Sequence, residues 1–454
     1  MKLHKEFFHY VIPSMLAFAL SGVYAIADGF FVGNALGDSA LAAVNIAYPL
    51  TAFLQAVGTG IGMGGAIQYA ISAGTENPKR GRQYFGMSLI MLTISGILLS
   101  ALLLLSAPVI LRFFGASGTI GELAQEYILY IAFGAIFQVL GTGLVPFIRN
   151  MGGAVSAMAA MIAGFLTNIF LDYLFVWHLP FGMMGAAVAT VIGQAVTFLV
   201  CVAFFIAKKK KPLLRFGKDG IFLFKTILKV GLSPFGLTFS PNITLILINK
   251  SAALVGGAAA VTCYESGRDE PVRTAHHHHH GAAAVTCYAP VSYISAIIIL
   301  LLQGVSDGCQ PLISLSYGEG RHDRTKQFRN LAYSFAAAVS LLCMGVLFLL
   351  RGQAAALFGA SPQITARVAD ILPVFLSGYL FVSISRVTTA YFYATDKDLQ
   401  AYIMIYGEVI ILFLLLLILP QMTGIGGTWF SVPFSQLAAM CISIFLIMKE
   451  KKKA

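Results

Sequence analysis

Charged residues are scarce in this chain. Asp, Glu, Lys and Arg make up 11% of its 454 residues, whereas a soluble domain carries about 25%. Hydrophobic residues make up 58%, and they form continuous runs long enough to cross about 30 Å of hydrocarbon. This composition excludes an ordinary soluble protein and predicts an integral membrane protein. Because the runs are continuously apolar rather than alternating, we expect α-helices instead of a β-barrel.

Motifs for several kinds of chemistry are missing as well. The chain has no G-x-x-x-x-G-K-[ST] sequence, so ATP is not expected to supply energy. It has neither H-E-x-x-H nor G-x-S-x-G, and its six cysteines lack the spacing of metal ligands. We therefore expect no enzyme, no cofactor, and cysteines that pack as small core residues. The first apolar run lacks a small-residue cleavage site, so we expect it to remain as a membrane span.

The apolar runs and the short polar breaks between them predict twelve transmembrane helices. The fold class is therefore an all-α integral membrane protein. The predicted spans lie at about 7–33, 39–72, 84–110, 122–147, 154–177, 184–207, 226–252, 286–316, 328–350, 367–393, 399–420 and 426–448.

Lys and Arg gather on one side of the predicted spans. Most lie in segments that share a side with the N-terminus, including the block KKKKPLLRFGKDG at 208–220 and the terminal KEKKKA. The positive-inside rule therefore places both termini in the cytoplasm, for a multi-pass protein of a bacterial-type plasma (inner) membrane. This asymmetry accounts for the net charge of +11, so we expect no nucleic-acid partner, which would need a basic face on a soluble module.

A short duplication interrupts the second half of the chain. The sequence GAAAVTCY occurs at 257–264 and again at 281–288, and five histidines lie between the copies. We interpret 265–288 as an engineered insertion that carries a purification tag, in the extracellular loop between the seventh and eighth spans. A natural His-rich metal-binding loop is the alternative.

The two halves of the chain resemble each other. FFGAS at 113–117 returns as LFGAS at 357–361, and GTENPKRGRQYF at 74–85 aligns with GEGRHDRTKQFR at 318–329. Because each repeat holds six spans, an even number, the halves have the same orientation. We predict two parallel six-helix lobes, 1–207 and 226–454, joined by a basic cytoplasmic linker at 208–225. Such repeats suit alternating access with a substrate site near the membrane midplane.

Acidic residues inside the predicted spans distinguish the first lobe. Asp28 aligns with Asn249 of the second half, and Asn168 and Asp172 align with two leucines. An ionisable residue within the membrane is a functional hypothesis by default. Asn168 and Asp172 are four residues apart, so they share one helix face. Two carboxylates shielded from water could hold a proton and release it when water enters, or hold Na⁺ through oxygen ligands. A purely structural role, with the carboxylates tied to neighbouring donors, is the alternative.

Three other charged residues lie in or near predicted spans. Asp307 is closer to the cytoplasmic end of its span, which favours a structural or gating role, with Arg386 as a candidate partner. Glu408 lies close to a helix start, where an interfacial position without a role in transport is favoured.

The first helix of each half contains a proline, Pro13 and Pro234. Each removes a backbone hydrogen bond and predicts a kink, so Pro13 is a candidate hinge. Tyr24 lies one turn before Asp28 and is a candidate to line the same cavity, although an aromatic residue on such a face is more often plain packing.

Several motifs, taken in order, resemble the multidrug and toxic compound extrusion (MATE) family and, within it, the DinF/MepA-type branch. They include ADGFFVGN around Asp28, FIRNMGG after the fourth span, TNIFLDYLF, GAAVAT and QPLISLSYG. The resemblance covers essentially the whole chain except the duplicated segment. It implies an antiporter that expels cationic or amphipathic drugs in exchange for H⁺ or Na⁺, without another cofactor, acting as a monomer among membrane lipids.

The same resemblance implies the site residues. The cation-coupling set of that branch corresponds to Asp28, Asn168, Asp172 and Thr190, and a pocket residue of the first lobe corresponds to Tyr24. Another branch carries acidic residues in the second lobe, where this chain has Asn249 and Arg386, so that site is not carried over. A flippase of lipid-linked precursors, a membrane enzyme and a receptor stay as alternatives, and the coupling ion stays open between H⁺ and Na⁺.

Overall fold

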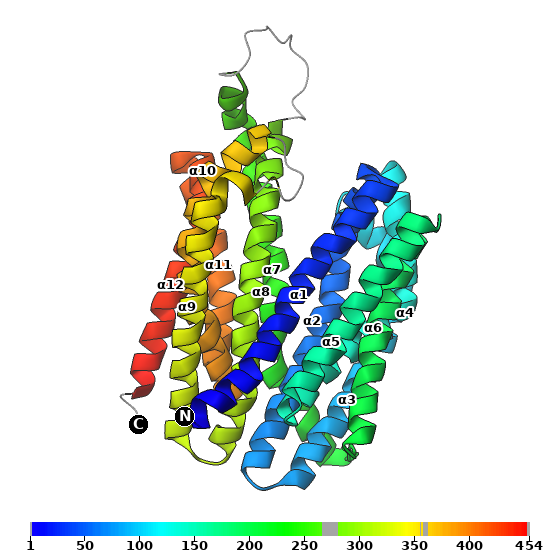
Figure 1. Ribbon diagram of the computed structural model, residues 1–454, viewed down its shortest axis with the longest axis vertical. Coiled ribbons are helices and arrows are strands. Elements are labelled where there is room, and N and C mark those ends of the chain that lie inside the picture. The colour runs from blue at the N-terminus through cyan, green and yellow to red at the C-terminus, as the bar shows by residue number, and fades with distance from the viewer. Residues whose placement is uncertain (1, 266–279, 355, 357–361, 452–454) are drawn as a thin grey trace. The chain divides into compact units, whose positions relative to one another are not determined.

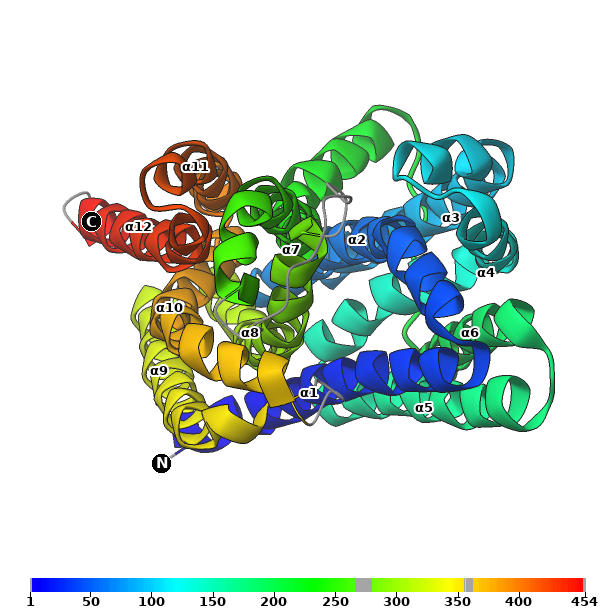
Figure 2. The same ribbon diagram turned by 90° about the horizontal axis from the view of Figure 1, so that it is seen from above.

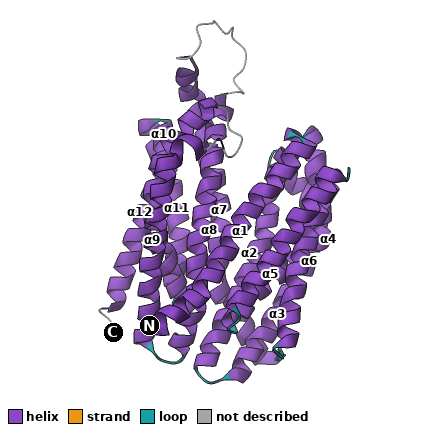
Figure 3. Ribbon diagram, viewed as in Figure 1, coloured by secondary structure: helices purple, strands orange, loops and turns teal. Residues whose placement is uncertain are grey.

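The computed structural model describes residues 2–265, 280–354, 356 and 362–451. Within these residues the regular structure is helical and no strand occurs, as Figure 3 shows. In this described part of the chain, twelve helices are long and apolar enough to cross a membrane. The predicted fold class, an all-α membrane protein with twelve spans, is confirmed. Residues 266–279 of the predicted insertion and the repeat copy at 357–361 lie outside the described residues.

The helices follow one another with short connections. Their bounds are α1 Lys2–Leu36, α2 Asp38–Gly74, α3 Pro78–Phe113, α4 Gly118–Asn150, α5 Ala154–Asp172, η1 Tyr173–His178, α6 Gly182–Ala207, α7 Gly217–Glu265, α8 His280–Gly318, α9 His322–Ala354, α10 Pro362–Ala394, α11 Asp398–Thr423 and α12 Ile425–Lys451.

Most helices extend several residues beyond the predicted spans. The apolar runs mark the part within the hydrocarbon, whereas helical hydrogen bonding continues into the polar flanks. Several helices end at a glycine whose backbone φ is positive, a left-handed conformation in which other L residues are strained. Gly37 after α1 has φ 88° and Gly152 after α4 has φ 92°. The short π-helix η1 continues α5 directly after Asp172, a change of winding that the apolar pattern did not indicate.

The described contacts divide the chain into two compact units. The first consists of Met1–Phe239, Gln303–Leu331 and Ala390–Asp398, and the second of Ser240–Leu302, Ala332–Thr389 and Leu399–Ala454. The first unit therefore contains α1 to α6 together with single ends of later helices. The predicted lobe boundaries at 207 and 226 follow the internal repeat rather than contact density, and they stay a prediction.

Within the first unit, α4 is the most buried span. It packs against α2, α3 and α6, and α1 runs along α5, as Figures 1 and 2 both show. The core between these helices is filled by apolar side chains such as Leu92, Ile128 and Phe147, all fully buried. This packing brings α1, α5 and α6, which carry the predicted site residues, next to one another.

Helices α2 and α4 approach each other closely at two glycines. A Cβ at Gly62 would lie 2.5 Å from the Cα of Gly143, which is closer than two non-bonded carbon atoms can pack. Small residues at such crossings let the helix backbones meet, a common device in membrane bundles. Gly62 is therefore required by the neighbouring backbone and not by a turn.

Replacing Gly62 with Ala should lower stability by about 1–3 kcal/mol, because the backbone of α4 must shift to make room. The midpoint of thermal unfolding in detergent is the measurement. Gly345 in α9 is the matched control, since nothing lies within 4 Å of a Cβ built there. Gly345→Ala should leave the midpoint unchanged or raise it, because Ala favours helix over Gly. Equal unfolding midpoints for Gly62→Ala and Gly345→Ala would contradict the close packing of α2 against α4 at Gly62.

The second unit is held by polar contacts between apolar helices. The hydroxyl groups of Ser295 and Tyr379 lie 2.8 Å apart, and those of Ser251 and Thr428 lie 2.9 Å apart. In hydrocarbon such interhelical hydrogen bonds add to van der Waals packing. Glu408 of α11 and Arg386 of α10, two residues of opposite charge, lie near enough to interact electrostatically within this unit.

Candidate functional site

The predicted cation-coupling residues come from three neighbouring helices of the first unit. Asp28 lies on α1, Asn168 and Asp172 lie on α5, and Thr190 lies on α6. Asp172 is 0% exposed and Asn168 is 2% exposed, whereas Asp28 is half-buried. The four-residue spacing in α5 places Asn168 and Asp172 on the same face, as the sequence predicted.

Asp28 and Asp172 form a pair. Their carboxyl groups lie near enough to interact with each other. A hydrogen bond between them would need a proton on one of them, because an ionised carboxylate only accepts. Oδ1 of Asp28 and both carboxylate oxygens of Asp172 are shielded from solvent and receive no hydrogen bond from the residues that the structure describes. Two bare negative charges in this position would be costly, so the pair favours a proton or a cation between them.

Asn168 and Thr190 lie beside this pair. The amide Nδ2 of Asn168 donates to Thr190 Oγ1 at 3.3 Å, and Thr190 Oγ1 donates to the carbonyl of Ala186 at 3.1 Å. One N–H of the amide is thereby used, while its Oδ1 is buried and accepts no hydrogen bond from the residues with a described position. A buried acceptor without a donor costs about 1–3 kcal/mol. Asn168 Oδ1 thus joins the carboxylate oxygens as an acceptor without a donor.

Aromatic side chains surround the carboxylate pair. Tyr24 stacks on Phe165 with ring centroids 5.2 Å apart and an interplanar angle of 13°. The phenols of Tyr24 and Tyr127 both interact with Thr190 and with the two aspartates. The sequence predicted that Tyr24 lies near Asp28, and in the structure the two residues interact. The role of Tyr24 in substrate binding stays a prediction.

Tyr127 and Phe165 were missed by the sequence analysis. Phe165 lies three residues before Asn168, so helical spacing alone could have placed it near the same face. Tyr127 lies in α4 within an apolar run, and its sequence carries no signal of this role. Its position depends on how α4 packs against the neighbouring helices.

The oxygen-rich character of the site limits what it can hold. Among the residues that the structure describes, no group of three His, Cys, Asp or Glu side chains is arranged around a metal. Carboxylates, an amide and a hydroxyl are the ligands of hard cations and sites for a proton. The arrangement therefore suits H⁺ or a small monovalent cation better than a soft transition metal.

Helix α1 continues through Pro13, which is buried. Near Pro13, helix α8 packs closely against α1: a Cβ added at Gly308 of α8 would lie 2.7 Å from the Cα of Val11. The hydroxyl of Ser14 is buried there and has no hydrogen-bond partner among the described residues. The hinge role of Pro13 stays a prediction, but the segment around it packs directly against α8.

Asp307 belongs to a buried polar cluster in the first unit. Its Oδ2 lies 3.9 Å from Arg149 NH1, and its Oδ1 accepts hydrogen bonds from Gln303 Nε2 at 2.6 Å and Tyr393 OH at 3.2 Å. Next to it, the amides of Asn150 and Gln310 bond to each other at 2.9 and 3.0 Å. The sequence analysis did not connect Arg149 with Asp307, and the proposed pairing with Arg386 stays a prediction.

The chain was compared with known families, proteins and structures. The MatE family model matches residues 13–174 and 274–418. The multidrug export protein MepA of Staphylococcus haemolyticus strain JCSC1435 is 22% identical over 453 residues, covering 98% of this chain and 93% of that protein. MepA of Staphylococcus aureus strain NCTC 8325 is 22% identical over 448 residues, covering 97% and 94%.

Two solved structures share the fold. One is an outward-facing conformation of a multidrug resistance MATE family transporter of the MOP superfamily, with a TM-score of 0.86 and 22% identity over 100% of this chain and 97% of that one. The other is a MOP superfamily transporter from Pyrococcus furiosus Vc1, with a TM-score of 0.85 and 23% identity over 98% and 95% of the two chains.

Proposed function

Because the chain belongs to the MatE family of membrane transporters, we propose that it is a multidrug efflux antiporter. It exports cationic and amphipathic compounds in exchange for H⁺ or Na⁺ by alternating access. The observation that carries the exchange is the neighbouring carboxyl groups of Asp28 and Asp172, whose buried oxygens receive no hydrogen bond from the described residues of the chain. The names of the staphylococcal relatives, multidrug export proteins, support the substrate class.

Coupling in this proposal is competition for one set of oxygens. When H⁺ or Na⁺ occupies the pair, with Asn168 Oδ1 and Thr190 Oγ1 as further ligands, the site carries little net charge and cationic drugs bind weakly. When the ion leaves, the negative charge returns and favours a cation. Tyr24 and the stacked Phe165 offer aromatic faces that attract organic cations. Each ligand lowers the affinity for the other by the same factor, because binding linkage is reciprocal.

The direction of transport follows from the proposed orientation. Both termini lie in the cytoplasm of a bacterial-type plasma membrane, and the ion flows inward as the drug leaves. The protein acts as a monomer, since the proposed ion site is built from residues of one chain. A flippase of lipid-linked precursors would bind a diphosphate, whereas the buried charges at this site are acidic, which favours the antiporter.

Transport of ethidium by proteoliposomes tests the proposal. An inward pH gradient and an inward Na⁺ gradient are imposed in separate experiments on the purified protein. The proposal expects ethidium transport under at least one of the two gradients. This transport should stop when an ionophore dissipates that gradient. Absence of movement under both, with protein of normal thermal stability, would contradict antiport and favour the flippase. The chain without residues 265–288 is assayed in parallel, so that a failure caused by that segment is recognised.

A further inference from the structure

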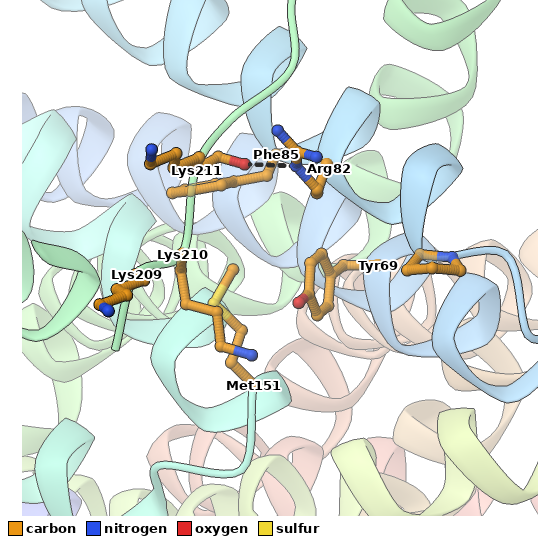
Figure 4. A pocket seen from close by; sticks show the side chains of 8 residues that line it. Tyr69, Arg82, Phe85, Met151, Lys209, Lys210 and Lys211 are labelled. Carbon is orange, nitrogen blue, oxygen red and sulfur yellow. Dashed lines mark hydrogen bonds between the residues drawn. The ribbon is translucent and has the colours of Figure 1, made fainter. Parts of the chain in front are cut away.

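A basic pocket lies at one end of the first unit, away from the carboxylate pair. It is a cavity of about 320 Å³ lined by Tyr69, Pro78, Arg82, Phe85, Met151, Lys209, Lys210 and Lys211. Figure 4 shows the three lysines along one segment of chain on one side of the pocket, with Tyr69 and Arg82 on the other. The residues come from the end of α2, the start of α3, the end of α4 and the connection between α6 and α7.

The charge of this pocket is of one sign. Four of the eight lining residues are cationic and none is acidic. In the part of the chain that the structure describes, Arg82, Lys209, Lys210 and Lys211 form no ion pair, whereas nearby Arg80 and Arg215 both pair with Asp219. Four cations held together without a counter-charge repel one another, and an anion bound among them would remove that repulsion.

The walls of the pocket are fixed by backbone contacts. Arg82 Nε donates to the carbonyl of Lys211 at 2.9 Å, and the amide of Leu213 donates to the carbonyl of Arg82 at 3.0 Å. A Cβ at Gly86 would collide with the backbone of Leu213, so the connection passes directly over α3. The backbone of the segment that carries the lysines is thus fixed against α3, which keeps the three lysines and Arg82 next to one another.

The position of the pocket suggests the source of the anion. The contributing ends of α2, α3, α4 and α6 follow one another in antiparallel order and therefore lie at the same end of the bundle. This end carries the basic segments that the positive-inside rule assigns to the cytoplasm. Lipid phosphates of the inner leaflet lie at that level, and basic pockets between transmembrane helices on the cytoplasmic side bind anionic headgroups.

We propose that this pocket binds a phosphate ester anion, with the headgroup of an anionic phospholipid of the cytoplasmic leaflet as its source. The phosphate lies among Arg82 and the three lysines, where two guanidinium nitrogens of Arg82 are not used in the bond to Lys211. Tyr69, Phe85 and Met151 provide an apolar wall for the glycerol and the first carbons of an acyl chain. This site is separate from the proposed ion exchange and does not depend on it.

Native mass spectrometry of the full-length protein in neutral detergent tests the site. Binding of phosphatidylglycerol is titrated against phosphatidylcholine, with inorganic phosphate and glycerol 1-phosphate as soluble competitors. The variant Lys209→Gln/Lys210→Gln/Lys211→Gln should bind phosphatidylglycerol roughly tenfold or more weakly, because each lysine near an anionic lipid contributes to binding. Lys209→Arg/Lys210→Arg/Lys211→Arg should retain the affinity.

The matched control removes the same charge elsewhere. Lys5→Gln/Lys225→Gln/Lys449→Gln changes three exposed lysines outside the pocket and should leave phosphatidylglycerol binding within about twofold of the wild type. Competition by the soluble phosphates would support recognition of the lipid through its phosphate ester, whereas binding of the soluble phosphates without binding of phosphatidylglycerol would assign the site to a free anion and overturn the lipid as its source. Equal weakening in both Gln variants, or equal binding of the two lipids by the wild type, would overturn the proposal. The midpoint of thermal unfolding identifies a misfolded variant. If the Gln variant is misfolded, binding of phosphatidylglycerol by the Arg variant tests the site instead, and loss of that binding would overturn the proposal.

Discussion

Asp28→Asn is expected to abolish gradient-driven efflux, with a fall in the initial rate on the order of 100-fold, near the upper range of coupling between two ligands. The amide occupies nearly the same volume as the carboxylate, so packing around Asp172 is retained. It carries no charge that can appear or disappear, and the competition between ion and drug is lost. The measurement is the ethidium assay in proteoliposomes under whichever gradient drives the wild type.

Asp172→Asn should have the same effect, because the two carboxyl groups act as one unit. Asp323→Asn is the control, since this carboxylate is exposed at the start of α9 and should transport at the wild-type rate. Each variant must elute as a single species with an unchanged unfolding midpoint. Robust gradient-driven efflux by a folded Asp28→Asn protein would contradict the coupling role of the pair.

Arg149→Met is expected to destabilise the protein by about 3–5 kcal/mol, the cost of leaving a buried charge without its partner. The side chain of Arg149 is 3% exposed, and that of Asp307 is 7% exposed. Besides the ion pair, Arg149 lies 5.8 Å from the ring centroid of Phe18 on α1. Removing it takes the cation of this ion pair away from Asp307, whose Oδ1 keeps the neutral donors Gln303 and Tyr393. The midpoint of thermal unfolding in detergent reports the loss.

The double variant Arg149→Met/Asp307→Leu distinguishes a specific pair from general damage. Replacing both charges by apolar residues removes the uncompensated charge, and such replacements of buried pairs are often neutral. The double variant should therefore be more stable than Arg149→Met alone, which gives a favourable coupling energy in the mutant cycle. Additive losses, or an unchanged midpoint in Arg149→Met, would show that the pair does not hold these helices together.

The sequence allowed much of the fold to be predicted. Hydropathy identified twelve spans because an apolar run of sufficient length has few alternatives in a chain with so little charge. The resemblance to the MATE family is confirmed by the family match. Helix ends were placed less well, since helical hydrogen bonding continues past the apolar runs to residues such as Gly37 and Gly152.

Part of the candidate site followed from the residues themselves. Asp28, Asn168 and Asp172 stand out because acidic and amide side chains are rare in apolar helices, whereas Thr190 came only from the resemblance to the MATE family. The structure places the four residues on the neighbouring helices α1, α5 and α6, and their role in cation coupling stays a prediction. Tyr127 was missed because a tyrosine in an apolar run is unremarkable until helix packing is known. The contact between Arg149 and Asp307 was missed for a different reason: an arginine next to a predicted helix end resembles an ordinary surface charge, and only tertiary packing buries it against Asp307.

The central claim is that the coupling ion and a cationic drug compete at the Asp28–Asp172 pair. Equilibrium binding of tetraphenylphosphonium to the purified protein, titrated across pH at fixed Na⁺ and across Na⁺ at fixed pH, tests it most directly. The wild type should lose about tenfold in affinity for each unit of falling pH, if one proton is displaced, or an equivalent amount as Na⁺ rises, and Asp28→Asn should bind weakly with no dependence on either. A wild-type affinity that is independent of both ions, or a dependence that persists unchanged in Asp28→Asn, would contradict it.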